Sequence, residues 1–354
     1  MKQSNRGISS GTTSFTNPVR SWSRREVVKS LTALAGSMGL FAQYPRPAAA
    51  EPPPETTSIK LVAVPAICIA PQYVAEGLLR AEGFSDVQYV KLKATTPGGV
   101  PIAAGVANLS LDAVGPLITA IDGGQPVVTL AGVHLGCYEL FAGTQVHSVR
   151  DLKGKTVPID GFNGPQHVFL SSMIAYVGLD PRKDINWVVH PSEESMQLFR
   201  EGKVDAYLGF PPEPQELRAQ GVGGVIVNTA VDKPWSQYFC CMLAGNRDFV
   251  QHHPMATKRA VRAILKAADL CAQEPERAAR MVVDKGFTKS YAYALETLKE
   301  VRYNAWRSHD PEDAFRFHAI RLHEVGMIKS TPQKIISQGT DWRFLNELKK
   351  EMKS

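Results

Sequence analysis

Cysteine is scarce in this chain, and its placement lacks the usual metal-binding motifs. The 354 residues contain five cysteines, none in a CxxC pair and none at the Cys/His spacing of a zinc site. Adjacent Cys240 and Cys241 would be a strained pair to bridge. We therefore expect no metal ion and mostly buried, free thiols, with a disulfide between distant members as the alternative. The five are Cys68, Cys137, Cys240, Cys241 and Cys271.

Motifs that mark common enzyme classes are missing as well. Residues 51–354 contain no G-x-S-x-G nucleophile elbow, no H-E-x-x-H zinc-protease motif and no lysine motif for a phosphate-bearing cofactor. No internal repeat occurs, and no low-complexity tract lies beyond the N-terminus. We therefore expect no catalytic residues and no cofactor.

Hydrophobic runs long enough to span a membrane are lacking near the N-terminus. The uncharged apolar run 31–41 is too short to cross a bilayer as a stable helix, which argues against a permanent anchor. It follows the basic stretch 23–29 and precedes the small residues Ala48–Ala50, and that order indicates a bacterial export signal. We expect residues 1–50 to be removed by cleavage near Ala50.

Paired arginines in this segment resemble the twin-arginine export signal, whose cargo crosses the membrane folded. Val27 stands where that signal usually has phenylalanine, and Ser37 stands where a lipoprotein would have its lipidated cysteine. The resemblance implies the twin-arginine translocon as a partner during export. We expect a soluble protein of the periplasm without a lipid anchor.

Excess positive charge is confined to the same segment. The chain has 40 Lys+Arg and 34 Asp+Glu, a net charge of +6, but residues 1–50 hold seven of the basic residues and one acid. The remainder has 33 of each sign, 40 less 7 and 34 less 1. The basic balance therefore gives no reason to expect a nucleic-acid partner.

Short apolar strands alternate with helices after a proline-rich lead-in, 51–57, that we expect to be disordered. Such alternation predicts an open α/β sheet whose ligands lie beyond the carboxyl ends of its strands. The expected strands of this first unit are 59–64, 87–92, 109–111 and 127–130. One expected helix begins at Pro71, a second ends before Gly105 and a third ends at Ile121.

The pattern starts again after a crossing near Gly143. A strand at 239–244 then leads back, and from Pro254 onward the chain is predicted to be helical and to pack on the first lobe. The second unit is expected to have strands 156–159, 185–189, 206–209 and 225–227, with helices 165–177, 192–200 and 215–220.

Residues 161–164, Gly-Phe-Asn-Gly, are expected to form a tight turn ahead of a helix that begins at Pro165. Free backbone N–H groups at such a helix start, together with the helix dipole, favour a negatively charged ligand. The alternative is an ordinary strand-to-helix connection that touches no ligand.

The chain contains, in this order, the short segments 105–109, 123–127, 149–155, 178–181 and 201–206. This is the order seen in the nitrate/sulfonate/taurine-type periplasmic solute-binding proteins, which the chain resembles over residues 58–290. These proteins belong to the broader group that includes the thiamine-pyrimidine-precursor binding proteins. Asn108 stands where the family commonly has aspartate, although Asp205 keeps the equivalent residue in the second unit.

The resemblance implies an α/β type II periplasmic-binding-protein fold, with two lobes around a central cleft and a C-terminal helical segment. It places 58–144 and 240–354 in lobe 1 and 145–239 in lobe 2. We expect a monomer whose partners are a small solute and the membrane subunits of an ABC importer. The cleft loops match no particular ligand subgroup.

Five loops should meet at the cleft: 65–72, 110–115, 134–138, 162–166 and 210–213. None contains Lys or Arg, so helix N-termini would bind an anionic head, and aromatic rings would contact a flat or apolar body. For each aromatic residue, a core position is the alternative. We expect ligand contacts from Pro71, Gln72, Ser110, Asp112, His134, Tyr138, Phe162, Asn163, Gly164, Gln166 and Phe210.

Two of these residues have specific consequences. Asp112 weighs against a bare, strongly charged anion, because like charge raises the cost of binding. Asn163→Ala should weaken binding by roughly 1–3 kcal/mol if Asn163 is a hydrogen-bond partner of the ligand.

We predict the binding component of an ABC importer, which closes its lobes around a small anionic organic solute resembling a sulfonate, nitrate or carboxylate. Two alternatives stay open. One is a periplasmic sensor subunit of the same fold. The other is an enzyme related to the pyrimidine-precursor synthases. Those enzymes have a cysteine-rich segment, to which residues 239–241 of this chain are weakly similar.

Overall fold

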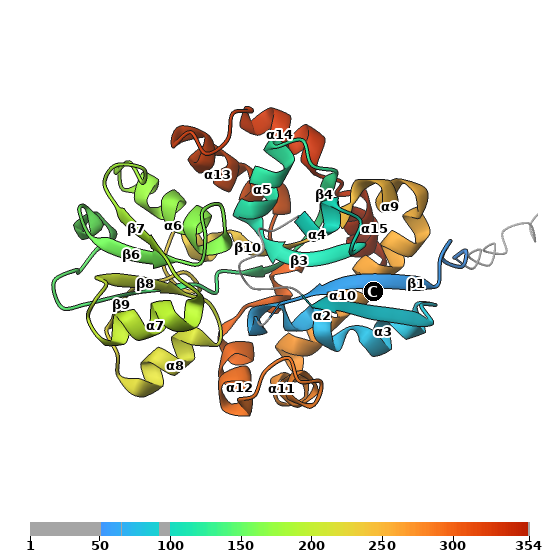
Figure 1. Cartoon of the computed structure of the whole chain (residues 1–354). Coiled ribbons are helices and arrows are strands. Elements are labelled where there is room, and N and C mark those ends of the chain that lie inside the picture. Colours follow the sequence, from blue (N-terminus) through green and yellow to red (C-terminus); the bar gives the residue numbers. More distant parts are fainter. Residues whose placement is uncertain (1–50, 65, 92–99, 353–354) are drawn as a thin grey trace, which may run out of the picture. The chain divides into compact units, whose positions relative to one another are not determined.

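The structure, a computed structural model, describes residues 51–64, 66–91 and 100–352 (Figure 1). Within the chain, Pro53–Ser354 form one compact unit. The expected export signal, with its twin-arginine and cleavage features, lies outside the described residues. No helix in the described part has the length and apolar character that crossing a membrane requires.

The first lobe is built on a five-stranded sheet in the order β2-β1-β3-β10-β4. Strand β1 is parallel to β2 and β3, whereas β10 is antiparallel to β3 and β4. Every residue of β4 and β10 is buried, as is typical of strands covered by helices on both faces. The strands are β1 (Ser58–Ala63), β2 (Asp86–Lys91), β3 (Leu109–Ala113), β4 (Val127–Leu135) and β10 (Phe239–Asn246).

The second lobe has a three-stranded sheet, β8-β5-β9, and a parallel pair, β6-β7. Its strands are β5 (Glu139–Ala142), β6 (Thr156–Ile159), β7 (Asn186–Val189), β8 (Ala206–Gly209) and β9 (Gly224–Asn228). Its helices are η2 (Val149–Leu152), α6 (Pro165–Tyr176), α7 (Ser192–Arg200), α8 (Glu213–Gln220) and η3 (Trp235–Gln237).

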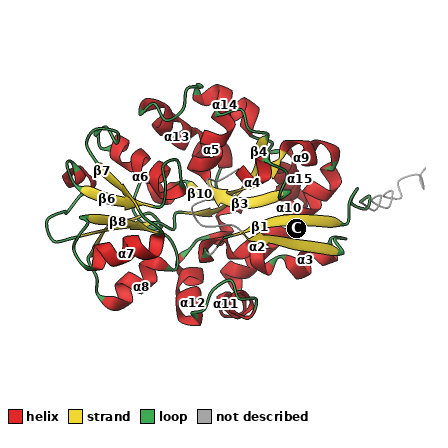
Figure 2. Ribbon diagram, in the orientation of Figure 1, coloured by secondary structure: helices red, strands yellow, loops and turns green. Residues whose placement is uncertain are grey.

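Helices flank the strands of the first lobe (Figure 2). The C-terminal helix α10 contacts α2 and β4, and α13 contacts α5. Two of these helices also reach the second lobe, α12 at α8 and α13 at α6. The helices are η1 (Ile67–Ile69), α2 (Ala70–Val74), α3 (Glu76–Ala81), α4 (Val100–Ala103), α5 (Val114–Asp122), α9 (Arg247–His252), α10 (Pro254–Gln273), α11 (Pro275–Asp284), α12 (Tyr291–Glu300), η4 (Tyr303–Arg307), α13 (Pro311–Glu324), α14 (Pro332–Gly339) and α15 (Arg343–Glu351).

The chain crosses to the second lobe earlier than the sequence predicts. Strand β5, placed by the sequence in lobe 1, pairs with β8 and β9, so the crossing comprises residues 136–138 rather than the region of Gly143. The backbone amide of Tyr138 donates to Thr229 Oγ1 (2.8 Å), and that of Thr229 donates to the Tyr138 carbonyl (2.9 Å). The outgoing and returning segments therefore lie side by side. Gly136 allows this approach, because a Cβ there would collide with the Thr229 backbone.

The proline-rich lead-in differs from the disordered segment that the sequence predicts. It contains no helix or strand, but the Glu55 carboxylate accepts hydrogen bonds from the amides of Met255 (2.9 Å) and Ala256 (2.8 Å) at the start of α10. These bonds use N–H groups that a helix leaves free at its first turn. The segment is thereby attached to the first lobe.

Candidate functional site

A cavity of about 70 Å³ lies where the strand ends of the first lobe face α6 and the end of β8. That volume holds a few water molecules or one small solute. All five loops that the sequence places at the cleft supply at least one lining residue, and β10 adds Cys241. The lining consists of Val64, Ala66, Cys68, Ile69, Leu111, Asp112, Ala113, Cys137, Tyr138, Pro165, Phe210 and Cys241.

Three of the eleven expected ligand contacts line this cavity: Asp112, Tyr138 and Phe210. Asp112 belongs to β3, which runs directly into α5 without the loop that the sequence predicts. Tyr138 lies on the crossing segment, and Phe210 directly follows β8. The site therefore takes side chains from both lobes and from the connection between them.

Aromatic rings form one wall of the cavity. The ring of Tyr138 stacks on Phe169 of α6, with centroids 4.7 Å apart and an angle of 20° between the planes. Phe210 approaches Tyr138 edge-on, with centroids 6.2 Å apart. These contacts fix Tyr138 in place, because aromatic pairs in such geometries add stability beyond the burial of their surface.

The electrostatics of the cavity rest on backbone dipoles and carboxyl groups, since no Lys or Arg lines it. Helix α6 begins at the cavity with Pro165, and its first turn receives no hydrogen bond from an N-cap side chain. Asp160, which sequence reasoning missed, is buried next to this helix start, and its Oδ1 has no hydrogen-bond partner among the described residues. Burial raises the pKa of Asp160 to about 6.

Four expected contacts are buried near the cavity but do not line it. Pro71 lies in the first turn of α2, and the helix continues through Ala75 into α3, but Pro71 does not line the cavity. The Gln72 side chain accepts from the Leu111 amide (2.8 Å) and donates to the Val62 carbonyl, which joins β1 to β3. Gln166 Nε2 donates to the Leu208 carbonyl (3.2 Å), and Ser110 is buried within β3. These residues hold the frame of the site.

The turn 161–164 differs from the sequence prediction more than the other four cleft loops do. Phe162 is 57% exposed and lies outside the cavity lining. Asn163 is also exposed and has a φ of 64°. Its backbone N–H donates a hydrogen bond to His167 Nδ1 (3.1 Å). Gly164 is the N-cap of α6 and lies against Asp160. The turn precedes the start of α6, and neither Phe162 nor Asn163 lines the cavity.

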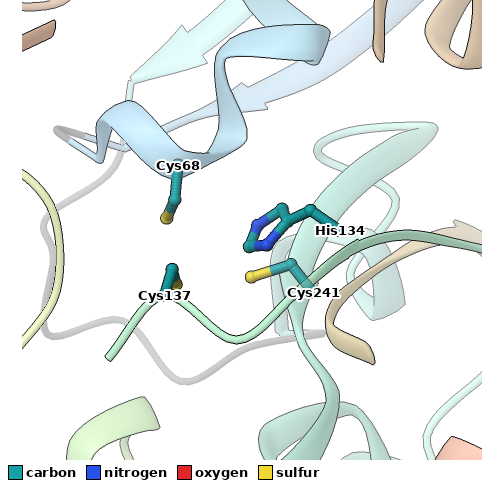
Figure 3. A group of neighbouring side chains, drawn as sticks. All are labelled: Cys68, His134, Cys137 and Cys241. Atoms are coloured by element: carbon teal, nitrogen blue, oxygen red, sulfur yellow. The ribbon is translucent and has the colours of Figure 1, made fainter. Parts of the chain in front are cut away.

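A cluster of thiols and an imidazole lies against the same cavity (Figure 3). Cys68 comes from η1, His134 from β4, Cys137 from the crossing segment and Cys241 from β10, and their ligand atoms lie within 4.8 Å of one another. All are buried, with exposures of 0–6%. As the sequence predicts, the five cysteines are buried and free. The four residues lie far apart in the sequence except for His134 and Cys137, so the cluster forms only in the folded chain.

Contacts within this cluster shift the pKa values of Cys68 and His134. The Cys137 and Cys241 thiols hold the pKa of Cys68 well below its ordinary value, against the effect of burial. Burial lowers the pKa of His134, but contact with Cys68 outweighs it and raises that pKa above its usual value. The pKa of each of these two groups therefore depends on its neighbours in the cluster.

Comparison with known proteins confirms the predicted fold. The periplasmic nitrate-binding protein NrtA from Synechocystis PCC 6803 superposes with a TM-score of 0.73 at 17% identity, over 85% of this chain and 90% of that one. The alkanesulfonate-binding protein SsuA from Xanthomonas axonopodis pv. citri, solved with MOPS, gives 0.65 at 15% identity, over 83% and 100%.

In sequence, the chain is similar to the bicarbonate-binding protein CmpA of Synechococcus sp., with 30% identity over 140 residues. The match covers 39% of this chain and 31% of CmpA, so the chain spans about a third of that relative's length. The family description that matches the chain extends over residues 52–283, more than half of its length. The two-lobed fold and this match together show that the chain belongs to the NMT1-like family.

Proposed function

We propose that this protein is the solute-binding component of an ABC importer of the periplasm. The observation that carries the proposal is the cavity between the lobes, lined from both of them. Crossing segments held together at Tyr138 and Thr229 form a natural hinge next to that cavity. A solute that contacts both lobes stabilises their closed arrangement, which the membrane subunits can then recognise.

The solute that best fits this site is a small oxyanion that also carries a hydrogen-bond donor. Free N–H groups at the start of α6 favour an anionic head without any cationic side chain. The carboxyl group of Asp112 is a suitable acceptor for a hydroxyl on the same solute, and it disfavours an anion that lacks one. The rings of Tyr138 and Phe210 line the cavity and offer an apolar surface that a short apolar part of the solute can contact.

Size narrows the choice further. A volume of about 70 Å³ suits a hydrogencarbonate or a short carboxylate or sulfonate better than a large aromatic ligand. The relatives named for bicarbonate, nitrate and alkanesulfonate binding support the class of solute.

Thermal unfolding of residues 51–354 with candidate solutes tests the proposal. The panel comprises hydrogencarbonate, nitrate, short alkyl sulfonates, aryl sulfonates, aromatic carboxylates and pyrimidines, each compared with chloride at equal ionic strength. A ligand at a concentration of one hundred times its Kd stabilises the folded state by roughly 2.7 kcal/mol, which raises Tm measurably. If no solute in the panel raises Tm above the chloride control, the importer assignment is overturned.

A further inference from the structure

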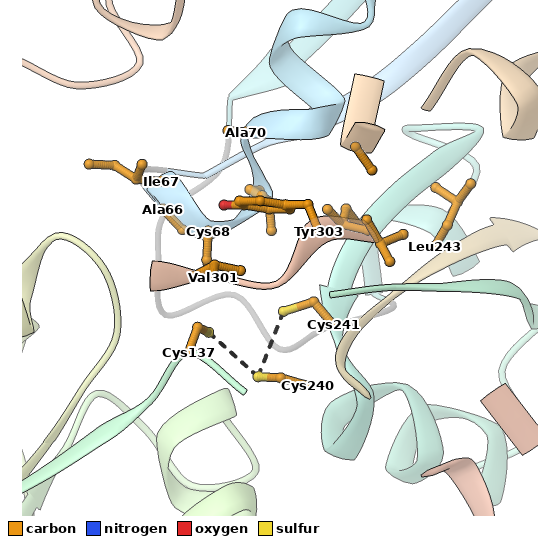
Figure 4. Packing of buried hydrophobic residues seen from close by; sticks show 14 of the residues in the cluster. Ala66, Ile67, Cys68, Ala70, Cys137, Cys240, Cys241, Leu243, Val301 and Tyr303 are labelled. Carbon is orange, nitrogen blue, oxygen red and sulfur yellow. Dashed lines mark hydrogen bonds between the residues drawn. The ribbon is translucent and has the colours of Figure 1, made fainter. Parts of the chain in front are cut away.

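We propose that Cys68, His134, Cys137 and Cys241 bind one soft transition-metal ion of the zinc class in the wall of the cavity. The proposal stands on the geometry of these four side chains and does not depend on which solute the protein captures. Figure 3 shows the four side chains, and Figure 4 shows the three cysteines together with Cys240.

The spacing of the four ligand atoms is close to that of a tetrahedral site. All lie within 4.8 Å of one another. A zinc ion about 2.3 Å from each sulfur places neighbouring ligands roughly 3.8 Å apart. The largest separation thus exceeds the tetrahedral spacing by about 1 Å, which the cysteine side chains would close by rotation on binding.

The imidazole of His134 presents the correct nitrogen. Its Nδ1 lies 2.6 Å from the Leu135 carbonyl oxygen, so Nδ1 carries the proton and donates it to this acceptor. Nε2 is then left with a lone pair, and it is buried without a hydrogen-bond partner among the described residues. The ring is held edge-on against Tyr303, with centroids 5.5 Å apart. A second-shell carbonyl that orients a histidine in this way is typical of metal ligation.

The donor set selects the kind of ion. Three sulfurs and one nitrogen suit Zn²⁺ or Cu⁺, whereas Mg²⁺ and Ca²⁺ prefer oxygen ligands. Four protein ligands complete a tetrahedral shell, which is characteristic of a resident ion with no open position. Because Cys137 belongs to the crossing segment and the other three belong to lobe 1, the ion would attach the hinge to the first lobe.

A disulfide is the competing chemistry. Cys240 Sγ lies 3.5 Å from Cys137 Sγ and 4.0 Å from Cys241 Sγ (Figure 4). Oxidation of Cys137 and Cys240 by a thiol oxidant would form one S–S bond, release two protons and two electrons to that oxidant, and remove a metal ligand. The metal and this disulfide therefore exclude each other.

The experiment uses untagged residues 51–354, purified with reductant, stripped of metal and then loaded with Zn²⁺ or Co²⁺. Metal is counted by mass spectrometry after gel filtration, and Co²⁺ is followed by its thiolate charge-transfer and tetrahedral d–d absorption. We expect one ion per chain. Cys137→Ser and His134→Ala should lower the affinity for Zn²⁺, measured against a chromophoric chelator, at least a hundredfold. Cys271→Ala, which removes a buried thiol outside the cluster, should retain it.

Several outcomes would overturn the proposal. One is a reduced wild-type chain, folded by circular dichroism, that retains less than a tenth of an ion. Another is a Cys271→Ala variant that loses as much affinity as Cys137→Ser. A third is a Co²⁺ spectrum without thiolate charge transfer. Because the wild-type measurement needs no variant to fold and no solute, its failure is distinguishable from a failure of the importer assignment.

Discussion

The Nη2 atom of Arg218 lies 2.7 Å from Oε1 of Glu300, which joins α8 of the second lobe to α12 of the C-terminal helices. The same guanidinium lies 2.7 Å from Glu296 Oε1 and contacts the buried carboxylate of Glu139. Gln215 Nε2 donates to Glu300 Oε2 over 2.8 Å. This ion-pair network joins the second lobe to the C-terminal helices through residues that do not line the cavity.

Arg218→Met should destabilise the protein by about 1–3 kcal/mol, because it leaves the Glu139 carboxylate buried without its counter-ion. The figure is below that of a fully buried pair, since Arg218 remains partly exposed. Glu300→Gln removes one exposed partner only and should cost less than about 1 kcal/mol. Urea unfolding measures both; equal losses would show that Glu139 does not need Arg218.

Glu55→Ala should destabilise the protein by about 1 kcal/mol, because it removes the acceptor for two amides at the start of α10. Glu55→Gln keeps an acceptor oxygen and should lose about half as much. Thermal unfolding compares the variants, and Pro53→Ala in the same segment is the control. An unchanged Tm for Glu55→Ala would mean that the lead-in is not attached to the first lobe.

The stability of the protein should fall as the pH drops from about 6.5 to about 4, in part because of His318. This side chain is 3% exposed, and burial lowers its pKa from 6.5 to about 4. Above pH 6.5 the imidazole is neutral in both the folded and the unfolded chain. As the pH falls below 6.5, the unfolded chain binds a proton at this ring before the folded chain does, which favours unfolding. The loss attributable to this group is roughly 3 kcal/mol by pH 4.

His318→Gln tests this assignment through the slope of stability against pH. The variant removes the titrating ring, so its stability between pH 6.5 and pH 4 should change less steeply than that of the wild type. The absolute stability also drops, because the contact with Phe169 is lost. Unfolding in urea at four pH values separates the two effects; parallel curves would exclude His318 as the source of acid sensitivity.

Phe210→Ala should weaken solute binding by about 1–2 kcal/mol, roughly tenfold, because it removes an aromatic wall of the cavity. Phe162→Ala is a matched control, since that ring is exposed and outside the lining. Titration calorimetry with the solute found by thermal screening measures both affinities. Comparable losses at the two positions would place the ligand at the turn 161–164.

Asn163→Ala should affect stability and leave solute affinity unchanged, which reverses the expectation from sequence. Asn163 has a φ of 64°, a region that asparagine tolerates better than alanine. The alanine variant should lose about 1 kcal/mol of stability, and Asn163→Gly should stay within about 0.5 kcal/mol of the wild type. A drop in affinity at constant stability would restore Asn163 to the site.

Local patterns in the sequence predicted most of the elements but missed β5. Its four residues, Glu139–Ala142, follow the strand β4 after only three residues, and the sequence predicts no strand there. Their pairing with β8 and β9 depends on residues 206–209 and 224–228, far along the chain. A strand this short is defined by its partners rather than by its own pattern.

The candidate site was predicted at the level of loops and less well at the level of residues. The five expected loops do meet at one cavity, because strand ends and helix starts follow from the α/β alternation. Side-chain direction does not follow from that alternation. Gln72 points to the backbone of β1 and β3, and Phe162 points to solvent, although both belong to loops at the cleft.

The order of residues is sufficient to predict the α/β alternation and the lack of cationic residues in the cleft loops. Both are local properties, written in the order of apolar, polar and turn residues. Only the tertiary structure decided where the chain crosses between lobes and that Cys68, His134, Cys137 and Cys241 meet. Those features depend on strand pairing and on the packing of distant segments, for which no short stretch of sequence carries a signal.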